Sequence, residues 1–157
     1  MGRALLIVGW LATIGWVANG VLGYLLGSTV RALTPHLLLG LVASLLLLFS
    51  HCWVMFYLIG TGKAIKDAVL EHRLETELAE RTKVFKSRTY PWLMLAMGLA
   101  IATFVLGGGY LAGAVPSWMH EVLFYATLVV QVWTLMLEGQ VLMANERLMA
   151  EINERLA

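Results

Sequence analysis

Charged residues are scarce in this chain of 157 residues and are absent from long stretches of it. Asp, Glu, Lys and Arg make up 13% of the residues, whereas soluble domains have about 25%. The apolar share is 60%, and the mean hydropathy is +0.79. Positions 4–28, 36–62, 91–120 and 122–137 contain none of these four charged residue types. The composition therefore excludes an ordinary soluble domain and predicts an integral membrane protein.

A membrane-spanning helix needs about 20 mostly apolar residues, and four such runs fit in the chain. They cover about 4–27, 35–61, 91–115 and 118–143. We expect an all-α, four-helix transmembrane bundle that forms a single domain over 1–157. The first run lacks a small-residue cleavage site, so we expect it to be retained as a helix.

Other absences narrow the function. Cys52 is the single cysteine, which rules out an intramolecular disulfide and a cysteine-based metal cluster. The net charge of +1 gives no reason to expect a nucleic-acid partner. The sequence contains no Ser-His-Asp, metalloprotease, P-loop or dinucleotide-binding fingerprint. We therefore expect no independent catalytic activity and predict no catalytic residues.

Basic residues predict the orientation of the bundle. Positions 62–90 carry seven of them: Lys63, Lys66, Arg73, Arg81, Lys83, Lys86 and Arg88. The connection between the first two runs has only Arg31, and the one between the last two has none. Because basic loops stay in the cytoplasm, we expect 62–90 and both termini there. The expected location is the bacterial inner membrane.

Two similar sequence segments lie near the expected outer side. GYLLGSTVRALTPH covers 23–36, and GYLAGAVPSWMH covers 109–120. The repetition predicts two similar helical hairpins, with Thr34-Pro35 and Pro116-Ser117 starting the second helix of each. Each segment also has two glycines four residues apart, Gly23 and Gly27 in the first and Gly109 and Gly113 in the second. This spacing lets another helix or a flat cofactor approach the helix backbone closely. His36 and His120 then lie at matching depth.

The second helix of each hairpin should continue beyond the membrane. Positions 63–88 contain no Gly or Pro and repeat apolar residues at helical spacing, and positions 144–157 do likewise among charges. Two interpretations remain open for these amphipathic extensions. They pack against each other as a cytoplasmic stalk, or they dock a cytoplasmic partner or a second copy of the chain.

Polar groups inside predicted spans mark candidate sites. His51 lies 15 residues after His36, and Glu138 lies at matching depth on the last span. We predict that His51 and Glu138 form a buried pair near Gln131, Gln140 and Asn145. A hydrogen-bonded structural pair and a functional site are both open at this stage.

Three functions fit these observations. The first is a small membrane subunit, non-catalytic by itself, that acts within an assembly of identical or different subunits in the lipid bilayer. The second is a b-type haem protein for electron transfer, with His36 and His120 as axial ligands and Gly23, Gly27, Gly109 and Gly113 beside the cofactor. The third is a proton- or quinone-handling site at His51 and Glu138. Apart from haem iron, no metal site is expected.

The second hypothesis has a parallel in known architecture. Histidines on spans two and four and glycines on spans one and three resemble the haem-binding four-helix core of membrane cytochromes b. Membrane cytochromes b that bind two haems need four histidines in their spans. Opposite His51 the last span has none, so either Met136 is the other ligand or the second haem is absent.

Overall fold

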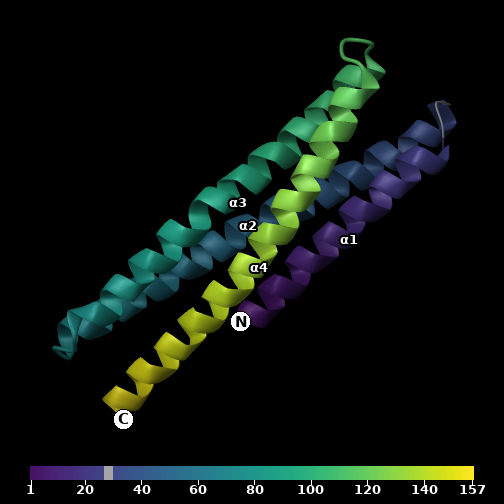
Figure 1. Cartoon of the computed structure of the whole chain (residues 1–157). Helices are drawn as coiled ribbons and strands as arrows, with labels where there is room; N and C mark the ends of the chain where they lie inside the picture. The colour runs from purple at the N-terminus through teal and green to yellow at the C-terminus, as the bar shows by residue number, and fades with distance from the viewer. Residues whose placement is uncertain (27–29) are drawn as a thin grey trace.

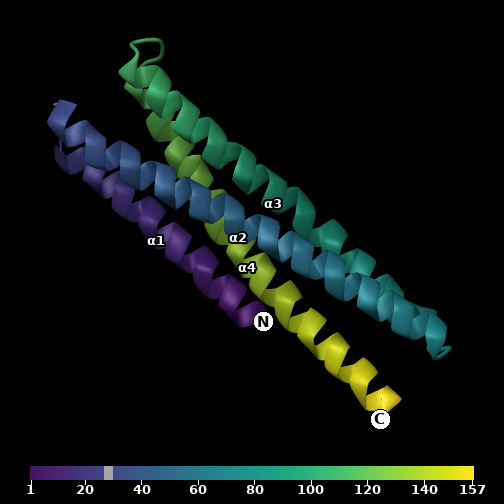
Figure 2. The same cartoon turned by 180° about the vertical axis from the view of Figure 1, so that it is seen from behind.

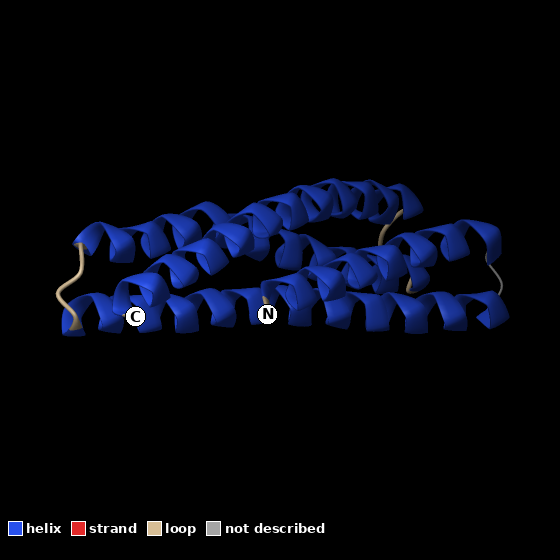
Figure 3. Cartoon of the chain, turned by 90° about the horizontal axis from the view of Figure 1, so that it is seen from below, coloured by secondary structure: helices blue, strands red, loops and turns tan. Residues whose placement is uncertain are grey.

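The computed structural model describes residues 1–26 and 30–157, which form four helices. Their bounds are α1 Gly2–Leu26, α2 Val30–Glu71, α3 Thr76–Leu111 and α4 Ser117–Leu156. Figure 3 shows helix nearly throughout, joined by short connections, and the described residues contain no strand. The all-α, four-helix prediction is therefore confirmed. Each helix is long and apolar enough to cross a membrane.

Two predicted helix ends are wrong. Helix α2 begins at Val30, so Pro35 lies inside the helix and not in its first turn. The first four amides of a helix have no intrahelical acceptor, so a proline at these positions loses no hydrogen bond. Pro35 lies just beyond them. Helix α3 ends at Leu111, four residues before the predicted end of the third span. Helix α4 starts at Ser117, with Pro116 rather than a hydroxyl side chain in the capping position.

The helices run up and down around a common axis (Figure 1). Helices α1 and α3 each pack against both α2 and α4, and α2 also contacts α4 across the diagonal. Between α1 and α3 no such contact occurs in the described residues. The C-terminal end of α1, the start of α2 and the α3–α4 connection lie at one end of the bundle, which we call the loop end. The α2–α3 connection and the C-terminus lie at the other end, which we call the turn end (Figures 1 and 2).

Helix α1 is the shortest, and the other three extend past it toward the turn end (Figure 2). Its first turn lies against α4, where the Gly2 amide donates a hydrogen bond to Glu146 Oε1 at 3.0 Å. Beyond that level, α2, α3 and α4 share a core made of Ile65, Val69, Leu78, Leu148 and Ile152. The apolar stripes of the extensions thus face one another, as the stalk interpretation expects. Arg73, with φ of 52°, lies in the connection that turns α2 into α3.

One close approach between hairpins depends on a glycine. The Phe124 ring on α4 lies against α1 at Gly20, and a Cβ placed on Gly20 would be 2.4 Å from Phe124 Cζ. The ring also stacks on Trp16, with centroids 6.1 Å apart and planes 3° from parallel. To give way, the Phe124 ring would have to leave this stack. A side chain at position 20 would therefore either break the stack or push α1 and α4 apart.

We predict that Gly20→Ala destabilises the bundle. The overpacking costs about 1–3 kcal/mol. That cost opposes the gain of about 1 kcal/mol that alanine brings inside a helix. The measurement is the unfolding midpoint of the purified protein in a denaturing-detergent titration.

Gly98→Ala is the matched control, because a Cβ there meets nothing within 4 Å. The control should leave the midpoint unchanged or raise it. Gly20→Ala combined with Phe124→Leu should regain most of the lost stability. Equal midpoints for the two glycine variants would contradict the role of this contact.

Candidate functional site

A cavity of about 670 Å³ lies between the hairpins at the loop end. All four helices line it, and its walls combine glycine, aromatic and histidine residues. The residues that line it include Trp16, Asn19, Gly20, Gly23, Tyr24, His36, Thr103, Gly107, Gly108, Tyr110, Gly113, His120, Glu121 and Phe124. Trp16 Nε1 and Asn19 Oδ1 are buried in this wall without a hydrogen-bond partner among the described residues. The cavity thus offers a largely apolar space with a few polar groups, as ligand sites do.

His36 on α2 and His120 on α4 meet in this cavity. Their ring centroids are 6.4 Å apart, and the ring planes are at 89° to each other. Both side chains are half-buried. The structure therefore brings together the two histidines that the sequence placed at matching depth.

Hydrogen bonds fix the tautomer of each ring. His36 Nδ1 lies 3.0 Å from the Asn19 carbonyl oxygen, and His120 Nδ1 lies 3.0 Å from the Thr103 carbonyl oxygen. A carbonyl oxygen only accepts, so Nδ1 carries the proton in both rings. Nε2 of a neutral ring is then the nitrogen with a free lone pair, which is the form that binds a metal. In the described part of the chain, neither Nε2 has a hydrogen-bond partner.

The two histidines have the same surroundings, repeated 84 residues apart. The spacing relates position 36 to 120, the carbonyl at 19 to the one at 103, and glycine 23 to glycine 107. A Cβ on Gly23 would lie 2.9 Å from His36 Cε1, and one on Gly107 would lie 3.0 Å from His120 Cε1. Each glycine thus gives a histidine ring room against the helix backbone.

This register corrects the predicted glycine set. Gly109, predicted as the counterpart of Gly23, packs against Val115 of the α3–α4 connection. Gly113 lines the cavity, but it lies past the end of α3 with φ of 69°, so the predicted helical pair does not form. Gly27 lies outside the described residues.

The sequence does carry the signal for Gly107. Val-Leu-Gly occurs at 21–23 and again at 105–107, and each glycine precedes a histidine by 13 residues. The Gly-Tyr-Leu-x-Gly match, which has one more identical residue, hid this register because its two copies stand 86 residues apart. Only the contact of each glycine with a ring shows which alignment has physical meaning.

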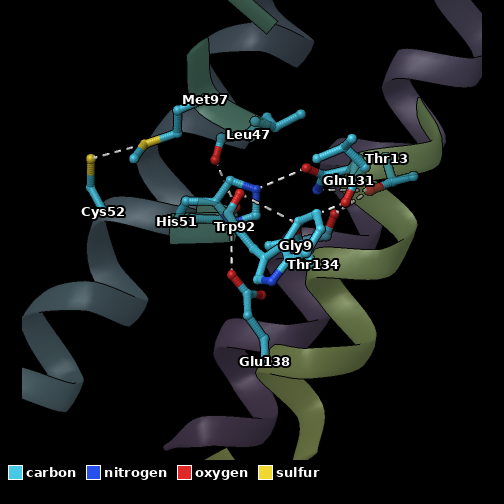
Figure 4. A network of polar contacts seen from close by, with 12 residues as sticks. Gly9, Thr13, Leu47, His51, Cys52, Trp92, Met97, Gln131, Thr134 and Glu138 are labelled. Carbon is cyan, nitrogen blue, oxygen red and sulfur yellow. Dashed lines mark hydrogen bonds and ion pairs between the residues drawn. The ribbon is translucent and has the colours of Figure 1, made fainter. Parts of the chain in front are cut away.

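A second polar site lies deeper in the bundle, 15 residues beyond His36 along α2. Figure 4 shows its side chains. His51 Nδ1 lies 2.7 Å from Glu138 Oε1, and His51 Nε2 lies 2.8 Å from Gln131 Oε1. The exposed fractions are 0% for His51, 0% for Gln131 and 1% for Glu138. Gln131 Nε2 in turn donates to Thr13 Oγ1 at 3.2 Å, and Thr13 donates to the Gly9 carbonyl oxygen. The structure thus brings together the predicted pair and adds Thr13, which the sequence analysis missed.

The chain of hydrogen bonds determines where the protons lie. Because the Gln131 amide nitrogen donates to Thr13, its oxygen faces His51, and Nε2 of that ring must carry a proton. One further proton lies on the 2.7 Å bond between Nδ1 and Glu138. Imidazolium with carboxylate and imidazole with carboxylic acid are the two ways to place it, and the pair is neutral overall in both. A neutral, fully bonded pair is the form that a buried site tolerates.

The remaining residues predicted near this pair lie elsewhere. Gln140 accepts a hydrogen bond from Arg88 at the surface. Asn145 accepts one from Thr61 on α2, nearer the turn end. Met136 is 47% exposed on the outside of α4, in a shallow hollow beside Val132. Neither Gln140 nor Met136 therefore contributes to the interior of the bundle.

Metal binding by side chains alone has little basis here. Across residues 1–26 and 30–157, no group of three or more His, Cys, Asp or Glu side chains is arranged to hold a metal ion. The cavity supplies two histidine nitrogens only. Two protein nitrogens are enough for a metal ion whose remaining ligands belong to a bound cofactor.

The chain matches no known family model, no curated protein and no solved structure. The fold and the two sites therefore define its class by themselves. It is an all-α bundle of four helices of membrane-spanning length, with a histidine-lined cavity at one end and a closed polar network in its middle.

We predict that the inner network stabilises the bundle as a unit. His51→Leu leaves the Glu138 carboxyl buried without its partner and should cost about 3–5 kcal/mol. Glu138→Gln keeps a hydrogen bond to a neutral imidazole and should cost about 1 kcal/mol. The quantity to measure is the free energy of unfolding in detergent micelles.

The double variant His51→Leu with Glu138→Leu removes both partners and should recover most of the loss. If it lost as much as the two single leucine variants combined, the two side chains would be energetically independent, and the idea of a coupled pair would fail.

Proposed function

We propose that this chain is an integral membrane protein that binds a b-type haem between His36 and His120 and passes electrons through it. The observation that supports this most directly is the pair of imidazole rings held 6.4 Å apart with both Nδ1 atoms donating to the backbone. When bound, a haem supplies reversible one-electron chemistry at its iron. His36 and His120 would hold it through their Nε2 atoms, and the cavity walls would limit access of water.

The separation of the rings fits two axial ligands of one metal. A metal–nitrogen bond to histidine is about 2.0 Å, so nitrogens on opposite sides of the metal lie about 4 Å apart. Half of each ring adds to this distance, which puts the ring centroids of such a pair about 6 Å apart. The observed 6.4 Å agrees with this value.

The cavity walls fit a flat, apolar group. Gly23 and Gly107 let the His36 and His120 rings lie against the backbones of α1 and α3. Gly108 also lines the cavity, and a Cβ placed there meets nothing within 4 Å, so a planar ring can approach α3 at this position. The Trp16 and Phe124 rings close the deep end of the space. At the other end Tyr24, Tyr110 and Glu121 are exposed, so the polar edge of a porphyrin would lie where water is available.

The proposed orientation follows from charge. Seven basic residues lie between positions 62 and 90, at the turn end, and this asymmetry favours a cytoplasmic turn end with both termini. The haem site then faces the outer side, which in a bacterial inner membrane is the periplasm. The predicted membrane assembly stays a prediction, because no contact among the described residues favours a partner subunit or a second copy.

We predict that the purified protein, expressed with ample haem, has a Soret band that shifts on reduction. His36→Ala and His120→Ala should each abolish the band, because each removes one of the two ligands. The measurement is the visible spectrum of oxidised and reduced protein in mild detergent, at equal protein concentration.

His72→Ala is the matched control, because His72 is an exposed histidine in the α2–α3 connection. It should leave the band unchanged. A wild-type protein without a Soret band would overturn the proposal, and so would full haem loading in both ligand variants.

The perpendicular rings predict a spectroscopic signature. Axial imidazole planes at a right angle leave two iron d orbitals nearly equal in energy, whereas parallel planes separate them. The Asn19 and Thr103 carbonyls hold the two ring planes at 89°. With haem bound between rings in this orientation, the oxidised protein would give a single resonance at unusually large g. Electron paramagnetic resonance at low temperature checks this. An ordinary three-line low-spin spectrum would show that the planes are closer to parallel.

A further inference from the structure

We infer that the chain holds one haem only, and that it exchanges electrons only with a carrier that reaches the loop end. The inference rests on the proposed function and adds stoichiometry and sidedness to it. The observation behind it is that side chains and hydrogen bonds occupy the inner half of the bundle, where a second haem would have to lie.

His51, the histidine one would assign to a second haem, has no free nitrogen. Both ring nitrogens are committed, at 2.7 Å to Glu138 and 2.8 Å to Gln131, and the ring is fully buried. To act as a ligand it would have to leave an acceptor unpaired in an apolar interior. Leaving a buried charged group unpaired costs far more than an ordinary hydrogen bond gains.

No second ligand lies opposite His51. The 84-residue register relates His51 to Leu135, which is 1% exposed. Leu135 also fills the space: its Cδ2 would lie 2.6 Å from a Cβ placed on Gly9. Met136, the alternative ligand on α4, lies on the outer surface of the helix. Side chains therefore fill the space around His51 in the inner half of the bundle, whereas the space around His36 and His120 in the outer half is a cavity.

A single redox centre at the loop end does not reach the turn end. His51 lies 15 residues beyond His36, which is about 22 Å along α2. Further residues of α2 continue beyond it to Glu71. Electron tunnelling rates fall exponentially with distance, and the stacked Trp16 and Phe124 rings close the cavity on that side. Exchange is therefore confined to the cavity mouth, beside the exposed Tyr24, Tyr110 and Glu121.

The first test counts haem per chain in the purified protein by haem extraction and amino-acid analysis. We expect one, both in the wild type and in the variant Met136→Leu, which removes the alternative ligand on α4 and leaves the cavity and the inner pair intact. Two haems per chain, or a loss of haem in the Met136 variant, would overturn this inference while leaving the proposed function standing.

The second test measures sidedness in liposomes that contain the reduced protein. Ferricyanide, which does not cross the bilayer, is added outside, and each ferricyanide ion takes one electron from one chain to give ferrocyanide. The haem absorbance should change rapidly only in molecules whose loop end faces outward. In a second preparation, the same ion enclosed in the liposomes should oxidise the complementary fraction.

The orientation is measured independently by trypsin, which cuts at Arg73 in the α2–α3 connection only when the turn end faces outward. The rapidly oxidised fraction should equal the fraction of chains that stay uncut at Arg73, and the masses of the fragments distinguish this cleavage from one at Arg31. Rapid oxidation of all molecules by external ferricyanide would show that electrons cross the whole bundle, and would overturn the confinement to the loop end. A protein that binds no haem would overturn the proposed function itself, and this inference with it.

Discussion

The bond between His51 and Glu138 sets how α2 and α4 face each other, and the cavity depends on that setting. Glu138 lies 18 residues after His120, which is five full turns, so the two side chains leave α4 on one face. His36 and His51 are 15 residues apart and differ by about 60° around α2. A network that turns Glu138 toward α2 therefore also turns His120 toward His36. The buried pair thus orients a site that it does not touch.

The two hairpins share a frame but differ in what fills it. Near the loop end the 84-residue register repeats a glycine, a carbonyl and a histidine, and the result is a cavity shared by both halves. Deeper in the bundle the register relates Glu138 to Val54 and Gln131 to Leu47. Each partner of the polar network is therefore apolar in the other hairpin, and both of these apolar residues are buried. His36 and His120 are alike, so they can bind one ligand between them. His51 and Glu138 are a base and an acid, so they bind each other.

Much of the fold followed from the sequence because apolar runs of about 20 residues permit few alternatives. The four helices, the helical extensions and the partnership of His51 with Glu138 could all be predicted from spacing alone. The start of α2 at Val30 and the counterpart of Gly23 could not. A helix can begin before a proline when its earlier residues also fit, and local spacing does not distinguish Gly107 from Gly109. Thr13 was missed because a threonine in an apolar helix carries no signal of its own.

The sequence by itself determined which residues share a depth, because depth follows from counting residues along helices of known rise. Only the tertiary structure decided which of those residues meet, since that depends on the rotation of each helix and on the side chains between them. It turned His36 and His120 toward one cavity with their Nδ1 atoms bound to the backbone. It also engaged both nitrogens of His51, which counting could not foresee, because the partner at Gln131 depends on how α2 faces α4.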